Sequence, residues 1–194
     1  MTEPGRPRAA ALVSGGGSTA LNLIDHDRRG DLAVSIELVV AHREDIPAVE
    51  RCRAIGVPVT IIPGSACTSA SDQLDALLVL ERIDLVLLCG YLRYFRGGPW
   101  RGRTLNVHPA LLPDFGGAGM HGDHVHAAVL QSGVRESGFT VHQVDEEYDH
   151  GEAILRRTVP VEAGDTVATL GERVRAAERL AYPEAISRWV QGRR

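Results

Sequence analysis

The sequence predicts an α/β protein: one domain built on an open, mostly parallel twisted sheet with helices on both faces. Two observations predict it. Short apolar runs alternate with stretches of helical periodicity through the first half of the chain, and the run 84–89 (DLVLLC) is apolar almost throughout, which is typical of the buried middle of a parallel sheet. Strands joined by helical crossovers lie parallel, so we expect the ligand crevice at the carboxyl ends of the strands.

The predicted elements follow one another in a simple order. The first half predicts strands and helices in alternation, beginning with a strand, at 9–13, 19–27, 34–41, 46–55, 57–62, 71–82 and 84–89. After these we expect a strand at 104–107, a helix near 124–133, strands at 138–144 and 154–161, and a last helix over 167–191. Pro183 is expected to interrupt that helix, because proline lacks a backbone donor and clashes with the preceding turn. No linker divides the chain, so residues 1–194 are expected to form a single domain, with 1–8 flexible.

Composition and charge argue against several classes of function. The chain has 44% hydrophobic and 24% charged residues and a formal net charge of −4, with no run of Lys or Arg. Its few aromatic residues do not interleave with basic ones as base-stacking surfaces require, so we expect no nucleic-acid partner. Nowhere do about 18 apolar residues run together, so no membrane span is expected. Small molecules remain as substrates, including anionic ones, because backbone dipoles bind phosphate whatever the net charge.

The N-terminus and the cysteines predict a cytoplasmic protein. The first ten residues carry positive charges with no long apolar core behind them, unlike a secretory signal. Cys52, Cys67 and Cys89 are odd in number and lack paired spacing, so we expect reduced thiols. A monomer and a homodimer both fit the sequence.

A glycine-rich segment, SGGGS at 14–18, follows the first predicted strand and opens the first helix. Glycine lets the backbone approach a ligand closely, and free amides at a helix N-terminus favour an anion, so the segment is a candidate phosphate site. A tight turn between strand and helix is the alternative. Gly15-x-Gly17-x-x-Ala20 also fits a loose dinucleotide fingerprint, but the second predicted strand does not end in the acidic residue expected for a ribose diol.

Asn106 and His108 stand at the end of a predicted strand. Alternation puts their side chains on the same side, and Pro109 favours an extended backbone at His108. A carboxamide and an imidazole side by side can hydrogen-bond a developing oxyanion and pass a proton, although each alone is more often structural. Asp149 follows an acidic stretch of a kind that is usually just solvated. A carboxylate beside His108 would stabilise the imidazolium and raise its pKa.

His121, His124 and His126 form a cluster after the predicted phosphate and oxyanion segments. Histidine is a common zinc ligand, so a metal site is one interpretation. The spacing matches neither the helical His-Glu-x-x-His arrangement nor another strong metal motif. We therefore expect a polar loop that leads into a helix, and no metal ion.

Taken in order, these motifs resemble the folate-dependent formyltransferase family over nearly the whole chain, 10–189. The segments that carry the resemblance are VSGGGS at 13–18, CGYLR at 89–93, LNVHPALLP at 105–113, GFTVHQVDEEYDHG at 138–151 and GDTVATLGERVRAAE at 164–178. The resemblance implies a Rossmann-like fold and transfer of a formyl group from 10-formyltetrahydrofolate to an amine, without a metal ion. The amine it implies is glycinamide ribonucleotide, in de novo purine synthesis.

The resemblance also implies roles for individual residues. It makes Asn106 and protonated His108 the donors to the oxyanion, and Asp149 the carboxylate that keeps His108 charged and helps to move the proton. Glu178, assisted by Arg175, matches a carboxylate for ribose hydroxyls and is the main reason to prefer glycinamide ribonucleotide. The residues matched to the substrate's phosphate are Gly15, Gly16, Gly17 and Ser18. The residues matched to the folate site are Leu92, Arg93, Phe95, Glu146, Glu147 and Tyr148.

Three departures from the family pattern keep alternatives open. Thr19 stands where the family usually has Asn, an arginine often found before the third helix is missing from 64–71, and the sequence after Pro113 (DFGGAGMHGDHVH) is longer than usual. Thr19 and the altered loop leave open a formyltransferase acting on another amine, such as an amino sugar nucleotide or a specialised metabolite, and the missing arginine puts one folate contact in question. More distant alternatives are a nucleotide-dependent oxidoreductase, a zinc hydrolase built on the histidine cluster, and a binding module without catalysis.

Overall fold

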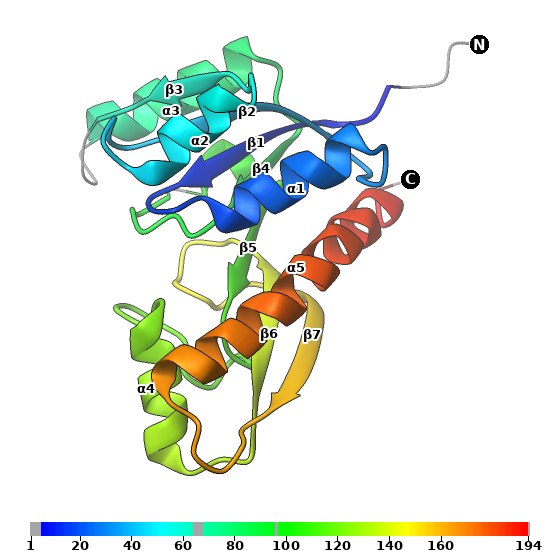
Figure 1. Cartoon of the computed structure of the whole chain (residues 1–194). Coiled ribbons are helices and arrows are strands. Elements are labelled where there is room, and N and C mark those ends of the chain that lie inside the picture. Colours follow the sequence, from blue (N-terminus) through cyan, green and yellow to red (C-terminus); the bar gives the residue numbers. More distant parts are fainter. Residues whose placement is uncertain (1–4, 64–67, 96, 194) are drawn as a thin grey trace.

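The computed structural model describes residues 5–63, 68–95 and 97–193 (Figure 1). Some predictions fall on residues that lie outside this description. They concern the thiol of Cys67, the flexibility of residues 1–4, and positions 64–67 of the stretch expected to lack the family's arginine. Cys52 and Cys89 are free and buried.

Among the described residues the strands form one seven-stranded sheet in the order β3-β2-β1-β4-β5-β6-β7. The strands are β1 Arg8–Val13, β2 Ser35–Ala41, β3 Val59–Ile61, β4 Leu85–Leu88, β5 Thr104–His108, β6 Glu136–Gln143 and β7 Ala153–Pro160. β1 to β5 pair in parallel, whereas β6 and β7 are antiparallel. The predicted fold class is therefore confirmed, and each predicted boundary lies within three residues of the observed one.

Helices cover both faces of the sheet (Figure 1). They are α1 Ser18–Arg28, α2 Pro47–Ala54, α3 Thr68–Leu80, α4 Asp123–Ser132 and α5 Val167–Gln191, with the 3₁₀ turn η1 Gly98–Trp100. Side chains of a strand alternate between faces, so Ala9, Ala11 and Val13 of β1 pack with α1, α2, α4 and α5. Ala10 and Leu12 pack on the other side with α3. Burial on both faces explains why the central strands are continuously apolar.

The expected interruption at Pro183 is wrong, because α5 runs through Val167–Gln191 with Pro183 buried inside it. A proline inside a helix is costly, but tertiary packing holds α5 on both sides of it. The buried Tyr182 donates from its hydroxyl to the Leu105 carbonyl at 3.2 Å, and Trp189 Nε1 donates to a backbone carbonyl at 2.9 Å. These contacts fix the helix against the sheet before and after the proline.

β5 joins the parallel and the antiparallel halves of the sheet. It pairs in parallel with β4 and antiparallel with β6, and Asn106 lies opposite His142 in that second pairing. The loop between β6 and β7 starts beside Leu105 and bends back towards the carboxyl end of β5. This places a loop from the antiparallel half over the strand ends where ligands of α/β proteins bind. No helix in the described part of the chain is long and apolar enough to cross a membrane.

Candidate active site

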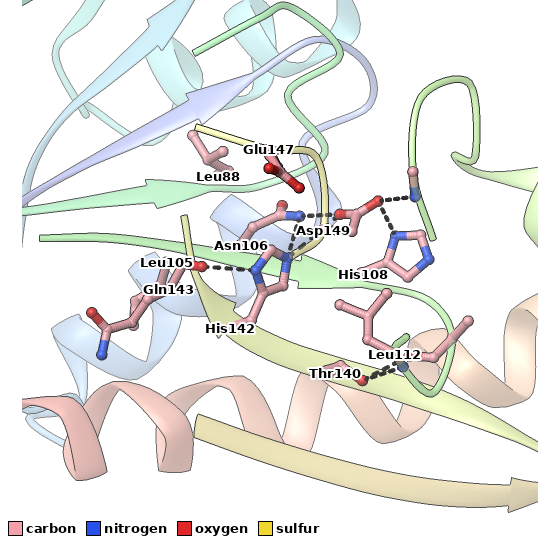
Figure 2. Close-up of polar contacts among 12 residues, drawn as sticks. Leu88, Leu105, Asn106, His108, Leu112, Thr140, His142, Gln143, Glu147 and Asp149 are labelled. Carbon is pink, nitrogen blue, oxygen red and sulfur yellow. Dashed lines mark hydrogen bonds and ion pairs between the residues drawn. The ribbon is translucent and has the colours of Figure 1, made fainter. Parts of the chain in front are cut away.

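The three residues predicted to be catalytic converge at the end of β5 (Figure 2). Asn106 and His108 lie two residues apart on β5 and point to the same side, as alternation predicts. Asp149 reaches both from the β6–β7 loop. Its Oδ2 lies 3.3 Å from His108 Nδ1, and its Oδ1 accepts a hydrogen bond from Asn106 Nδ2 at 3.4 Å. The geometry satisfies the condition on which the predicted roles depend, and the roles themselves remain predictions.

The β6–β7 loop holds Asp149 in a left-handed backbone conformation, with φ of 56°. Such a conformation costs a non-glycine residue about 1–3 kcal/mol and persists only where the surroundings enforce it. Here Gly117 N–H donates to Asp149 Oδ2 at 3.1 Å. Gly151 allows the loop to pass close to β6, because a Cβ at this position would lie 1.9 Å from the Gln143 carbonyl oxygen. The loop is thus built to bring this carboxylate to β5.

His142 of β6 also belongs to the site and is not among the residues predicted from the sequence. Its Nε2 lies 3.2 Å from Asn106 Nδ2 and 3.5 Å from Asp149 Oδ1. Its Nδ1 donates to the Gln143 carbonyl at 2.9 Å, which fixes the orientation of the ring. We call Asn106, His108, His142 and Asp149 the β5 cluster. The signal for His142 is its pairing opposite Asn106, which depends on the antiparallel register of β6.

The expected effect of Asp149 on His108 is only partly correct. Burial lowers the pKa of His108, and although the Asp149 charge raises it, the net direction is down. The pKa of Asp149 is also lowered: burial raises it, but the hydrogen bond from His142 and the charge of His108 outweigh that effect. Asp149 therefore counteracts burial at His108 without fully compensating for it. Asp149 itself stays ionised at neutral pH.

Both ring nitrogens of His108 already have partners. Nδ1 faces Asp149, and Nε2 donates to the Phe115 carbonyl at 2.8 Å. A carbonyl and a carboxylate are both acceptors, so the ring meets both partners as a donor only when it is protonated. Donation from His108 to a developing oxyanion therefore requires one of these two contacts to open.

A pocket of about 440 Å³ extends from the β5 cluster to helix α5. Of the predicted residues, five line this pocket: Asn106, His108 and Asp149 from β5 and the β6–β7 loop, and Arg175 and Glu178 from α5. The remaining lining residues come mostly from the segment 90–93 and from the loop 117–122 that precedes α4. The unusually long loop after Pro113 thus forms a wall of the pocket. One continuous space connects the predicted reaction centre with the predicted sugar-binding carboxylate.

A second, smaller pocket of about 70 Å³ also borders the β5 cluster. Asn106 and Asp149 line both pockets, so the cluster stands where the two spaces meet. Predicted folate residues that line the second pocket are Arg93, Phe95, Glu146, Glu147 and Tyr148. Arg93 and Tyr148 line the larger pocket as well, and Leu92 lines the larger pocket only. Tyr94, which the sequence did not single out, lines the second pocket and contacts Tyr148 edge to face with ring centroids 5.9 Å apart.

Glu178 is buried on α5, with 8% of its surface exposed. Burial raises its pKa to about 7, although the charges of Arg175 and Arg179 act in the opposite direction. Its carboxylate makes no hydrogen bond to any residue in the described ranges. Arg175 is held by Glu172, with Nε 3.3 Å from the Glu172 carboxylate. A buried carboxyl group without a partner in the free protein is a candidate ligand-binding group.

The predicted phosphate loop lies at the edge of the larger pocket. Gly17 has φ of 73°, and a Cβ there would lie 2.7 Å from the Ala48 side chain, so the turn into α1 requires glycine. Among the described residues, Thr19 lines the pocket and the four residues 15–18 do not. Ser14 Oγ accepts a hydrogen bond from Leu92 N–H at 2.9 Å, which joins this loop to the segment 90–93.

The histidine cluster does not assemble as one group. His121 and His124 contact each other edge to face, with ring centroids 5.4 Å apart, whereas His126 is buried on α4. In the part of the chain that the structure describes, no group of three or more His, Cys, Asp or Glu side chains is placed to hold a metal ion.

Comparisons with known proteins point to one family. A family model described as formyl transferase matches residues 7–186. The chain is 40% identical over 192 residues to the chloroplastic phosphoribosylglycinamide formyltransferase of Arabidopsis thaliana, covering 95% of this chain and 65% of that protein. It is 37% identical over 196 residues to the human trifunctional purine biosynthetic protein adenosine-3, covering 98% of this chain. The chain spans only 19% of the human protein's length.

Solved structures agree with the sequence relatives. Glycinamide ribonucleotide transformylase 1 from Symbiobacterium toebii superimposes with a TM-score of 0.87 at 35% identity, covering 96% of this chain and 89% of that one. Phosphoribosylglycinamide formyltransferase from Bacillus halodurans superimposes with a TM-score of 0.85 at 30% identity, covering 92% of this chain and 93% of that one.

Proposed function

This chain belongs to the formyl transferase family, and on that premise we propose that it transfers the formyl group of 10-formyltetrahydrofolate to the amine of glycinamide ribonucleotide, in de novo purine synthesis. One observation carries the proposal. The β5 cluster stands at the junction of two pockets, which is where a two-substrate transfer needs its polar groups. The names of the relatives support this amine, as does Glu178, which is buried, lines the larger pocket and makes no hydrogen bond to a described residue.

In this mechanism the free amine attacks the formyl carbon, a carbon–nitrogen bond forms, and the carbonyl electron pair moves onto oxygen. Asn106 donates a hydrogen bond to that oxyanion, and His108 donates a second one when protonated. The oxyanion then collapses, and the bond from the formyl carbon to the folate nitrogen breaks. The proton lost by the amine passes to the leaving nitrogen. Ionised Asp149 accepts and relays this proton, and it also supports the charged form of His108.

The two substrates occupy different spaces in this proposal. The folate lies in the smaller pocket against Arg93, Phe95 and the loop residues Glu146, Glu147 and Tyr148, and reaches Leu92 where the two pockets meet. The ribonucleotide lies in the larger pocket, with its ribose hydroxyls at Glu178 and Arg175. Its phosphate lies at the N-terminus of α1, where Gly15, Gly16, Gly17 and Ser18 offer backbone N–H groups. Each substrate thus approaches the β5 cluster from its own side.

We further propose that residues 1–194 act as a single cytoplasmic domain, as a monomer or a homodimer, without a metal ion, a nucleic acid or a membrane partner. The net charge of −4 and the free, buried Cys52 and Cys89 support this description. A different amine substrate stays as the second candidate, because Thr19 and the loop 117–122 both line the amine pocket and both depart from the family pattern.

Turnover with 10-formyltetrahydrofolate against a panel of amines tests the proposal. The panel contains glycinamide ribonucleotide, an amino sugar nucleotide and a simple primary amine, with Asn106→Ala protein as the background control. We expect the highest kcat/KM with glycinamide ribonucleotide. Turnover of another panel member, combined with none of glycinamide ribonucleotide, would show that the substrate assignment is wrong. No turnover of any amine would contradict formyl transfer itself.

A further inference from the structure

His126 on α4 is a buried polar residue that faces the larger pocket. Only 2% of its surface is exposed, and the residue lines the same pocket as Arg175 and Glu178. Neither ring nitrogen has a hydrogen-bond partner among residues 5–63, 68–95 and 97–193, and Nδ1 is fully enclosed. Buried side-chain nitrogens normally find partners, so this ring needs an explanation. The sequence predicts a polar loop that leads into a helix here, and such a loop does not explain why the His126 ring is buried without a hydrogen-bond partner.

The proton of His126 belongs on Nε2. Burial, and then the charge of Arg175, lower the pKa of the ring; Asp123 raises it and His108 lowers it further, and the net direction is down. The ring is therefore neutral at neutral pH and carries one N–H. An enclosed acceptor without a partner is less costly than an enclosed donor, so the enclosed Nδ1 is the bare nitrogen. This leaves Nε2 as a donor without an acceptor among the described residues.

Gly171 on α5 makes room for the ring at the sugar end of the pocket. A Cβ at Gly171 would lie 2.9 Å from His126 Cδ2, 3.2 Å from His126 Nε2 and 3.1 Å from Arg175 Nη1. Glycine is unfavourable inside a helix, and here it lets the imidazole rest against the helix beside Arg175. Glu178 follows Arg175 by three residues, on the same face of α5.

We propose that His126 is a further substrate-binding residue. Its Nε2–H donates a hydrogen bond to the oxygen of a sugar hydroxyl group, and the same hydroxyl group donates its hydrogen to Glu178. A hydroxyl group both donates and accepts, whereas an ionised carboxylate only accepts. A hydroxyl that donates to Glu178 therefore still needs a donor for its oxygen. The neutral imidazole supplies one, and it lines the same pocket as Glu178 and packs beside Arg175. The assignment rests on the proposed function.

Kinetics of His126→Phe and His126→Gln test the assignment. Phenylalanine keeps the ring and removes the donor, whereas glutamine places an amide N–H near the former Nε2. A lost hydrogen bond contributes about 0.5–1.5 kcal/mol, so His126→Phe should raise the KM for glycinamide ribonucleotide roughly 2- to 13-fold. The KM for 10-formyltetrahydrofolate and kcat should stay near wild type, and glutamine should restore most of the loss. His124→Ala, an exposed histidine of the same helix, is the matched control.

The decisive comparison uses the 2′-deoxy and 3′-deoxy forms of glycinamide ribonucleotide. With the analogue that lacks the contacted hydroxyl, His126→Phe and wild type should have the same KM. A KM for the natural substrate that does not change in His126→Phe, or an increase of equal size with both deoxy analogues, would overturn the assignment. Wild-type protein that does not formylate glycinamide ribonucleotide at all would instead overturn the proposed function.

A measurement on the unaltered protein guards against variants that fail to fold. Nitrogen NMR of ¹⁵N-histidine-labelled wild type should show His126 protonated at Nε2 in the free protein. The Nε2 signal should shift on addition of glycinamide ribonucleotide, and shift much less with the analogue that lacks the contacted hydroxyl. A ring protonated at Nδ1, or the same shift with all three ligands, would contradict the proposal.

Discussion

Two groups of polar residues contribute to the larger pocket: the β5 cluster, and a second group that we call the α5 end, formed by Glu178 on α5 and His126 packed against α5. The two groups differ in how their polar atoms are paired. In the β5 cluster, Asn106 and His142 contact Asp149 and each other, and His108 joins them through the same carboxylate. At the α5 end, Glu178 and His126 are buried, neither makes a hydrogen bond within the described residues, and His126 Nδ1 is fully enclosed. The first group is paired within the protein, and we propose that a ligand completes the second.

This difference separates positioning from recognition. A buried polar group left without a partner costs about 1–3 kcal/mol, whereas a paired one costs little. The β5 cluster therefore holds its geometry without a ligand, and only one contact of His108 has to open before this residue can donate to an oxyanion. The α5 end has polar groups without hydrogen bonds among the described residues, and we propose that a substrate with hydroxyl groups supplies them. Changes in the β5 cluster should lower kcat, and changes at the α5 end should act on binding and on stability.

The largest effect is expected in the β5 cluster. Asn106→Ala and His108→Ala should each lower kcat by roughly 100- to 1,000-fold, because each removes one donor to the oxyanion. The KM for glycinamide ribonucleotide should change little, since that substrate's remote contacts remain. Steady-state kinetics with both substrates measure this. Near-normal turnover in either variant would refute the oxyanion role of that residue.

A matched control is needed, because both residues also support the loop that carries Asp149. His124→Ala removes an exposed imidazole from the neighbouring helix and should behave as wild type. Circular dichroism and thermal melting of each variant establish that the fold is kept. An inactive variant that is also unfolded would say nothing about the oxyanion, so His108→Gln serves as the second, less disruptive substitution.

The sequence predicts the β5 cluster well where strand alternation decides the geometry. Asn106 and His108 lie two residues apart on one strand, so their side chains must point to the same side of the sheet. The motif around Asp149 predicts the third member of the group. His142 escapes prediction because its contact depends on which residue of β6 lies opposite Asn106. The sequence also does not predict the direction in which the pKa of His108 is shifted, for a different reason. The direction is set by a balance between burial and one nearby charge, and burial is a property of the whole fold.

The α5 end shows where local rules fail. Proline lowers helix stability locally, but the buried faces on both sides of Pro183 hold α5 together. The sequence marks Glu178 as a binding residue through its resemblance to a family, and no pattern indicates that the carboxyl group is buried without a partner. His126 stands out in sequence only as part of a histidine run. Its enclosure follows from a glycine 45 positions away, at Gly171, on another helix.

The second effect concerns stability and its dependence on pH. Burial raises the pKa of Glu178 from 4.5 to about 7, so stability from the neutral form is fully present below about pH 4.5 and is lost as pH rises through 7. Glu178→Gln keeps the shape and cannot ionise. The variant should therefore exceed wild type in free energy of unfolding above pH 7 by on the order of 3 kcal/mol, with little difference near pH 4.5.

Urea unfolding of both proteins at pH 5 and pH 8 measures this. A Glu178→Gln protein that is no more stable than wild type at pH 8 would mean that the carboxylate has a partner in solution, and the contrast between the two pocket ends would fail. Glu184→Gln is the control, because Glu184 is an exposed carboxylate of the same helix paired with Arg157 and Arg188. It should show no gain in stability at pH 8.

The smallest of the three effects is on substrate binding. Hydrogen bonds to charged groups contribute about 1.5–3 kcal/mol, so Glu178→Ala should raise the KM for glycinamide ribonucleotide roughly 10- to 150-fold, with a much smaller fall in kcat. The reason lies in the proposed role: Glu178 lines the pocket from α5, apart from the β5 cluster in the fold, and is proposed to bind the ribose, which does not react. The KM for 10-formyltetrahydrofolate should not change. If kcat fell as far as in Asn106→Ala while KM stayed constant, Glu178 would belong with the reacting groups, and the division between a preformed end and a ligand-completed end would not describe this pocket.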